Sequence, residues 1–87
     1  MIDPHLYLYG TGACHLCDQA ELLLSTVLDN AQECLKKVDV SASDKLITQY
    51  GTRIPVLRAQ HRDGHWEELQ WPFDQPALRA FLALVDA

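Results

Sequence analysis

Basic residues are scarce in this 87-residue chain, because seven Lys and Arg stand against twelve Asp and Glu and give a net charge of −5. Nucleic acids and anionic membranes attract a basic face, so this balance argues against both as partners. Long apolar runs are also missing, since none approaches the roughly 20 residues of a membrane-spanning helix. The N-terminus lacks a basic region followed by a long apolar stretch, so we expect a cytoplasmic protein without a secretory signal.

Cysteine is equally sparse, with three residues at Cys14, Cys17 and Cys34. An odd number without a secretory signal does not indicate a disulfide-stapled scaffold. In a reducing cytosol a close cysteine pair is more often catalytic or metal-binding than structural. The chain also lacks internal repeats, low-complexity segments and linkers, so we expect one domain over residues 1–87 and a monomer.

Hydrophobic residues make up 48% of the chain, and their spacing predicts alternating strands and helices. We expect a strand at 5–9, a helix at 14–29, a strand at 33–40, a helix at 41–51, strands at 53–60 and 65–71, and a helix from 74 onward. Right-handed crossovers make the first two strands parallel, whereas the closing hairpin is antiparallel. The prediction is therefore an α/β sandwich, with a mixed four-stranded sheet covered by helices on both faces.

Local signals mark several ends of these elements. Ser41 with Asp44 three residues later forms a capping-box pattern, and Gly51 is suited to end the helix that follows. The dipeptide Asp63-Gly64 predicts the turn of the closing hairpin. Asp74 can cap the last helix.

The cysteine pair lies where redox chemistry would place it. Cys14 follows the first strand and a loop with Gly10 and Gly12, and it falls at the first turn of the first helix. Free backbone N–H groups and the helix dipole stabilise a thiolate there, so we expect Cys14 to have a lowered pKa and to be the nucleophile. Cys17, one turn further and less exposed, would resolve the mixed disulfide. A protonated His15 between them would further favour the thiolate.

Metal binding is the main chemical alternative for the pair. A structural zinc site needs about four ligands, and the chain has no second CxxC. The candidates to complete a set, which are His5, His15, Cys34, His61 and His65, repeat no ligand spacing. His61 and His65 flank the predicted hairpin turn and are interpreted as solvated residues, and Cys34 as a small buried core residue. We therefore expect no metal site.

Ile54-Pro55 is the second informative feature. Proline cannot donate to a sheet ladder, so its place at a strand start needs a reason. A cis bond packed against the cysteines would be such a reason, because it would leave the backbone of Ile54 free to pair with a bound peptide or thiol substrate. The alternative is an ordinary trans proline at a strand start. Trp71 and Phe73 either cap the core or contact substrate, and we favour the core.

Together the stretches "LYGTGACHLC", "VDV", "GTRIPVL" and "WPFD" resemble those of the thioredoxin-fold glutaredoxins. The resemblance is closer to the small bacterial glutaredoxin-like proteins, and it covers essentially the whole chain. It implies a thioredoxin-like fold, a cis Pro55, Cys14 as nucleophile and Cys17 as resolving thiol. It also implies a thiol–disulfide oxidoreductase that reduces protein or glutathione mixed disulfides. Glutathione is then a candidate co-substrate, and no tightly bound cofactor is expected.

The residues around the pair depart from the glutaredoxin pattern. Thr11 stands where glutaredoxins carry a basic residue, and Trp71-Pro72 stands where they carry a Gly-Gly pair that receives glutathione. Arg53 could supply the missing cation, and Asp74 could meet an ammonium group. The candidate substrate-binding residues are thus Thr11, Arg53, Ile54, Pro55, Trp71 and Asp74. Two alternatives stay open, which are a non-enzymatic binding module and zinc or iron–sulfur binding through Cys14 and Cys17.

Overall fold

The computed structural model of the chain describes residues 6–28, 35–61 and 63–86, with the side chain of residue 86 left out. Its elements are β1 (Leu6–Gly10), α1 (His15–Val27), β2 (Leu35–Asp39), the 3-10 turn η1 (Val40–Ala42), α3 (Asp44–Tyr50), β3 (Val56–Gln60), β4 (Trp66–Gln70) and α4 (Gln75–Asp86). The predicted order of strands and helices is confirmed, with ends shifted by a few residues. The expectations for residues 5, 29, 33 and 34 lie outside the described residues.

The four strands form one mixed sheet in the order β2-β1-β3-β4. β1 pairs in parallel with β2 and antiparallel with β3, which pairs antiparallel with β4. β1 is therefore an interior strand, as its apolar residues on both faces predict. Because β3 runs against β1, Val56 at the start of β3 lies opposite Tyr9 near the end of β1.

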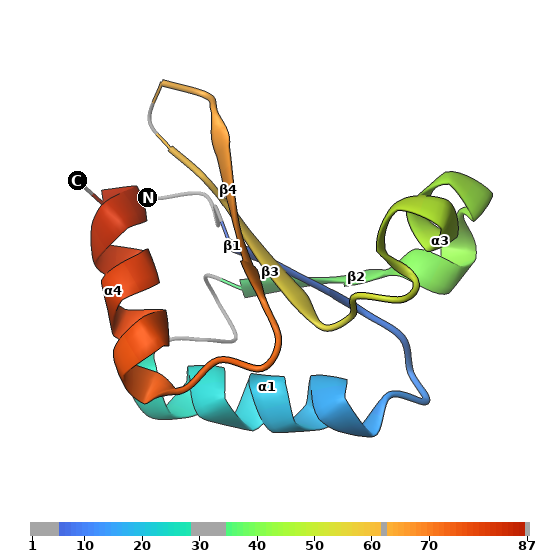
Figure 1. The fold of residues 1–87 in the computed structure, drawn as a ribbon, viewed down its shortest axis with the longest axis horizontal. Coiled ribbons are helices and arrows are strands. Elements are labelled where there is room, and N and C mark those ends of the chain that lie inside the picture. The colour runs from blue at the N-terminus through green and yellow to red at the C-terminus, as the bar shows by residue number, and fades with distance from the viewer. Residues whose placement is uncertain (1–5, 29–34, 62, 87) are drawn as a thin grey trace.

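Two hydrophobic clusters hold helices against the two faces of the sheet. On one face, Ala20 and Leu24 of α1 and Leu78 and Phe81 of α4 pack with buried residues of the strands. On the other face, Tyr50 at the end of α3 is buried with Val40 and Val56. Figure 1 shows α1 and α4 together on one side of the sheet and α3 on the other. The predicted α/β sandwich is confirmed, and in the described part of the chain no helix combines the length and apolarity needed to span a bilayer.

One predicted helix end is wrong. Ser41 does not cap α3, because its N–H and hydroxyl both donate to Asp39 Oδ1, at 2.9 and 2.6 Å, within the 3-10 turn η1. The cap is Ser43, whose hydroxyl accepts the Leu46 N–H at 3.4 Å. A serine-rich stretch offers several residues that can cap a helix, and the turn η1 that follows β2 selects the later one.

Candidate active site

Three segments that carry the predicted site residues meet at one end of the sheet. β1 ends at Gly10, and the loop that follows leads to Cys14 at the start of α1. The antiparallel register of β1 with β3 brings Ile54-Pro55, which immediately precedes β3, to the same end. The sheet therefore brings together the cysteine pair and the proline that the sequence analysis singled out.

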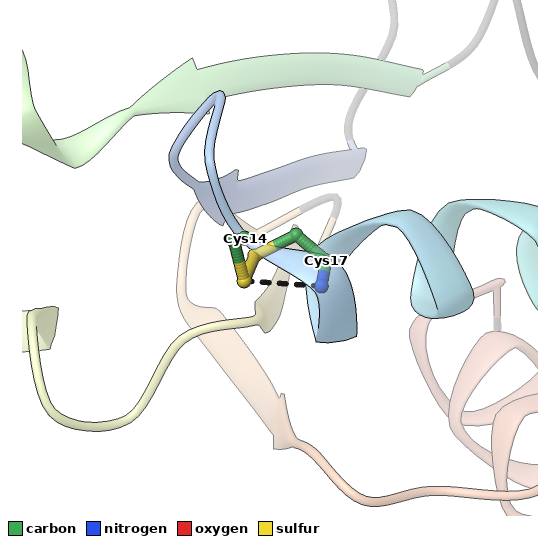
Figure 2. The surroundings of a disulfide bond; sticks show 2 residues. All are labelled: Cys14 and Cys17. Atoms are coloured by element: carbon green, nitrogen blue, oxygen red, sulfur yellow. Dashed lines mark hydrogen bonds between the residues drawn. A yellow bond between two sulfur atoms is a disulfide. The ribbon is translucent and has the colours of Figure 1, made fainter.

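Cys14 is the N-terminal cap of α1. Its backbone is extended (φ −106°, ψ 106°), and its Sγ accepts a hydrogen bond from the Cys17 N–H at 3.1 Å. The Cys14 carbonyl accepts the Asp18 N–H at 3.2 Å, which starts the helix. Cys14 and Cys17 form a disulfide, and Figure 2 shows both side chains at the first turn of α1. A Cys14 thiolate at this cap would accept the same N–H and lie at the positive end of the helix dipole.

The two cysteines differ in their access to solvent. Cys17 is buried, with 7% of its surface exposed, whereas Cys14 is half-buried. Gly10 makes room for the buried sulfur, because a Cβ at that position would lie 2.7 Å from Cys17 Sγ. Cys14 is thus the more accessible residue of the pair, as expected, and the division of roles stays a prediction.

His15 is exposed at the first residue of α1. Its Nε2 lies 3.1 Å from the Gln19 amide nitrogen, one turn along the helix, and this is its only hydrogen bond among the described residues. The ring therefore makes no hydrogen bond with Cys14 or Cys17 in this disulfide form. Its predicted effect on a Cys14 thiolate stays a prediction.

The Ile54-Pro55 peptide bond is cis, and so is the bond between Trp71 and Pro72. The two dipeptides are linked, because the Trp71 N–H donates to the Pro55 carbonyl at 3.2 Å. Pro55 is buried, whereas Ile54 is half-buried against the α3 side of the sheet. Among the described residues, the N–H and C=O of Ile54 form no backbone hydrogen bond. Sequence reasoning did not anticipate the second cis bond or its link to the first.

The segment after β4 packs against the core and caps the last helix. The Trp71 ring meets the buried Phe73 ring edge-on, with centroids 5.1 Å apart, and it packs against the larger core cluster. This contact agrees with the core-capping interpretation of both aromatics. Asp74 caps α4, since its Oδ1 accepts the Ala77 N–H at 2.9 Å. The predicted cap is confirmed, and one carboxylate oxygen is engaged in it.

Arg53 and Thr11 have very different surroundings. The Arg53 guanidinium donates to the Gln49 carbonyl at 3.1 and 3.3 Å and contacts the Glu68 carboxylate at 3.4 Å. The Arg53 side chain is thereby held at the end of α3, and it would have to leave these partners to meet a substrate.

Thr11 is half-buried in the loop before Cys14 and lines a pocket of about 320 Å³.

This pocket lies between the loop after β1, the first two turns of α1 and β2. It is lined by Leu8, Gly10, Thr11, Gly12, Cys17, Asp18, Glu21, Lys37, Val38 and Asp39. Across it, the Lys37 ammonium lies 3.3 Å from the Glu21 carboxylate. Cys17 therefore borders a hollow with both charged and apolar lining residues. No sequence motif predicted this hollow, because the β1–β2 pairing brings its segments together.

The family comparison agrees with this geometry. The Glutaredoxin-like domain (DUF836) family matches residues 5–83 of the chain. The chain belongs to this glutaredoxin-like family. No curated protein matches it.

Two solved structures are similar to this glutaredoxin-like chain over nearly all of its length. A structural-genomics target protein from X. campestris is 39% identical, with a TM-score of 0.73 over 91% of this chain and 96% of that one. A protein from Nitrosomonas europaea, solved by NMR, is 25% identical, with a TM-score of 0.69 over 93% and 94% of the two chains. With the strand order, these likenesses show the thioredoxin-like fold that the sequence predicts. The glutaredoxin-like domain and its CxxC pair therefore form a thiol redox fold.

Proposed function

We propose that this glutaredoxin-like protein is a thiol–disulfide oxidoreductase in which Cys14 attacks and Cys17 resolves. The observation that supports this most is the position of Cys14 as the cap of α1, with its sulfur accepting the Cys17 N–H. That hydrogen bond and the helix dipole both stabilise the thiolate form, which is the nucleophile. The greater exposure of Cys14 allows a substrate disulfide to approach it before Cys17.

The reaction has two thiol–disulfide exchanges. The Cys14 thiolate attacks one sulfur of the substrate disulfide, and the other substrate sulfur leaves as a thiolate that takes up a proton. Cys17, after losing its proton, attacks the Cys14 sulfur and releases the second substrate thiol. Two electrons pass to the substrate, its two sulfurs take up one proton from Cys17 and one from solvent, and the chain is left with the Cys14–Cys17 disulfide. A thiol donor then returns the pair to the reduced state.

The surroundings of the pair favour a protein disulfide as the substrate. Ile54 lies at the same end of the sheet as the pair, and its N–H and C=O form no backbone hydrogen bond with the described residues. An extended polypeptide can meet these groups as it meets a strand edge. At the position of the glutaredoxin Gly-Gly pair, the Trp71 N–H already donates to Pro55 and Pro72 has no N–H. Fewer free backbone donors are left there for glutathione, so we expect glutathione mixed disulfides to be the slower substrates.

The test compares the reduction of a protein disulfide with that of a glutathione mixed disulfide, using wild type, Cys14→Ser and Cys17→Ser. We expect wild type to act faster on the protein disulfide, Cys14→Ser to be inactive, and Cys17→Ser to accumulate a mixed disulfide at Cys14. Activity in Cys14→Ser would refute the assignment of the nucleophile. Partner binding that survives loss of both cysteines, with no reductase activity in wild type, would favour the binding module.

A further inference from the structure

Three potential metal ligands meet at the tip of the β3–β4 hairpin, away from the cysteine pair. The His61 N–H donates to the His65 carbonyl at 2.8 Å, so these residues oppose each other across the hairpin. Glu67, in β4, lies two residues beyond His65, which immediately precedes that strand. Directly opposed residues and residues two apart share one face of an antiparallel ladder, so the three side chains converge. The expected solvated position holds for His65, which is 53% exposed, but not for His61, which is 12% exposed.

The spacing of the three groups suits one small cation. Glu67 Oε1 lies 3.5 Å from the Nε2 atom of His61 and 3.5 Å from that of His65. The two imidazole rings are stacked, with centroids 3.8 Å apart and an interplanar angle of 16°, so one ring must turn about its side-chain bonds before both in-plane lone pairs point at one ion. Zinc bonds of about 2.0–2.2 Å in a tetrahedral arrangement place neighbouring ligand atoms roughly 3.3–3.5 Å apart. The two nitrogen–oxygen distances therefore match such a site closely.

A buried nitrogen in the cluster has a carboxylate oxygen of Glu67 at 3.5 Å but makes no hydrogen bond with the described residues. His61 Nε2 is shielded from solvent and makes no hydrogen bond with any residue that the structure describes. Buried polar atoms in folded proteins are nearly always satisfied, so this nitrogen is available to bind a ligand. A metal ion between His61, His65 and Glu67 would give this nitrogen a bond.

Asp63 in the turn fixes the orientation of the second imidazole. Its Oδ1 lies 2.5 Å from His65 Nδ1 and 3.1 Å from the His65 backbone nitrogen. A carboxylate only accepts hydrogen bonds, so Nδ1 must carry the proton in this contact. In the neutral ring the lone pair of His65 is then on Nε2, the atom beside Glu67. Metal-ligating histidines are commonly held in this way by a carboxylate on the other ring nitrogen.

We propose that His61, His65 and Glu67 form a zinc site, with both imidazoles bound through Nε2 and one position open to water. Two imidazoles and a carboxylate are ligands that Zn²⁺ accepts, and three protein ligands leave a fourth tetrahedral position free. Zinc there ties the end of β3 to the start of β4. The site lies at the opposite end of β3 from Pro55, so it is separate from the cysteine pair and does not depend on the proposed reductase activity.

The experiment titrates Zn²⁺ into the oxidised protein, with Cys34 alkylated, against a chromophoric chelator. Oxidation removes Cys14 and Cys17 as competing thiolates. We expect wild type to bind one zinc ion per chain, and Glu67→Gln and Asp63→Asn to lower the affinity by ~10-fold or more. His15→Gln is the matched control, because His15 is an exposed histidine outside the cluster, and it should bind zinc as wild type does.

A second measurement locates the ion directly. The imidazole nitrogen chemical shifts should change at Nε2 of His61 and His65 on zinc addition, while those of His15 stay fixed. Both substitutions are close in shape to the native residues, and circular dichroism checks that each variant is folded. The proposal is overturned if oxidised wild type binds no zinc, or if folded Glu67→Gln and Asp63→Asn bind it as tightly as wild type.

Discussion

Replacing Gly10 with alanine tests how closely the end of β1 must approach the cysteine pair. The added Cβ would lie 2.7 Å from Cys17 Sγ and 3.2 Å from Cys17 Cβ, well inside the 3.4 Å at which ordinary contact begins. Gly10 does not have a positive φ, so its backbone accepts alanine and the penalty is steric alone. Cys17 is buried, and it cannot move away without displacing its neighbours.

Gly10→Ala should lower the free energy of unfolding by the usual cost of overpacking, which is about 1–3 kcal/mol in a well-packed core. Gly12, two residues later in the loop after β1, is a matched control, because a Cβ there would meet nothing within 4 Å and its φ is not positive. Alanine at such a site is neutral or stabilises by about 0.4–1 kcal/mol, through the lower entropy of the unfolded chain. The two variants should therefore differ by roughly 1–4 kcal/mol in the free energy of unfolding.

Urea unfolding of the two oxidised variants measures this difference. A second assay follows the mixed disulfide at Cys14 during turnover, which should persist longer in Gly10→Ala because the sulfur of Cys17 is displaced from its position. Equal unfolding free energies for Gly10→Ala and Gly12→Ala would refute the close packing of Gly10 on Cys17. An unchanged lifetime of the mixed disulfide would refute the expected effect of Gly10→Ala on the attack by Cys17.

Three further predictions concern the scaffold. Asp74→Ala removes the side-chain acceptor at the start of α4 and should lower the free energy of unfolding by about 0.5–2 kcal/mol, measured in urea. Leu24→Ala should cost about 2–5 kcal/mol because Leu24 is fully buried, whereas Leu22→Ala, at a residue 68% exposed, should stay within ~0.5 kcal/mol in the same assay. Burial raises the pKa of Tyr50 above its usual range, so its neutral form contributes stability that is present below about pH 10 and is lost as the pH rises through the raised pKa. Tyr50→Phe should therefore flatten the fall in unfolding free energy above that pH, and an equally steep fall would contradict the assignment.

Local patterns predict much of this fold because its elements are short and strongly marked. The Leu-rich spacing of α1 and the Asp63-Gly64 turn carry their own signals, and Gly64 has the positive φ of 98° that such a turn favours. The position of Cys14 follows in the same way, since a strand, a glycine loop and an amphipathic helix occur in immediate succession. These features depend on neighbours in the sequence.

Features that depend on distant neighbours could not be predicted. The hydrogen bond from Trp71 to Pro55 and the pocket beside Cys17 require the sheet to be assembled first. The burial of His61 likewise follows from where the hairpin tip lies in the folded chain, and its spacing from His65 resembles no zinc motif. Ser41 and Ser43 are equivalent as caps in the sequence, and only the turn after β2 distinguishes them.

The proposed reaction requires Cys14 to be an activated thiolate, and the pH dependence of its alkylation tests this most directly. In reduced Cys17→Ser, which keeps the backbone N–H that Cys14 accepts, iodoacetamide labelling of the peptide carrying Cys14 is followed by mass spectrometry. We predict a midpoint well below the ordinary thiol pKa of about 8.5. A midpoint at or above that value would contradict the assignment of Cys14 as the nucleophile.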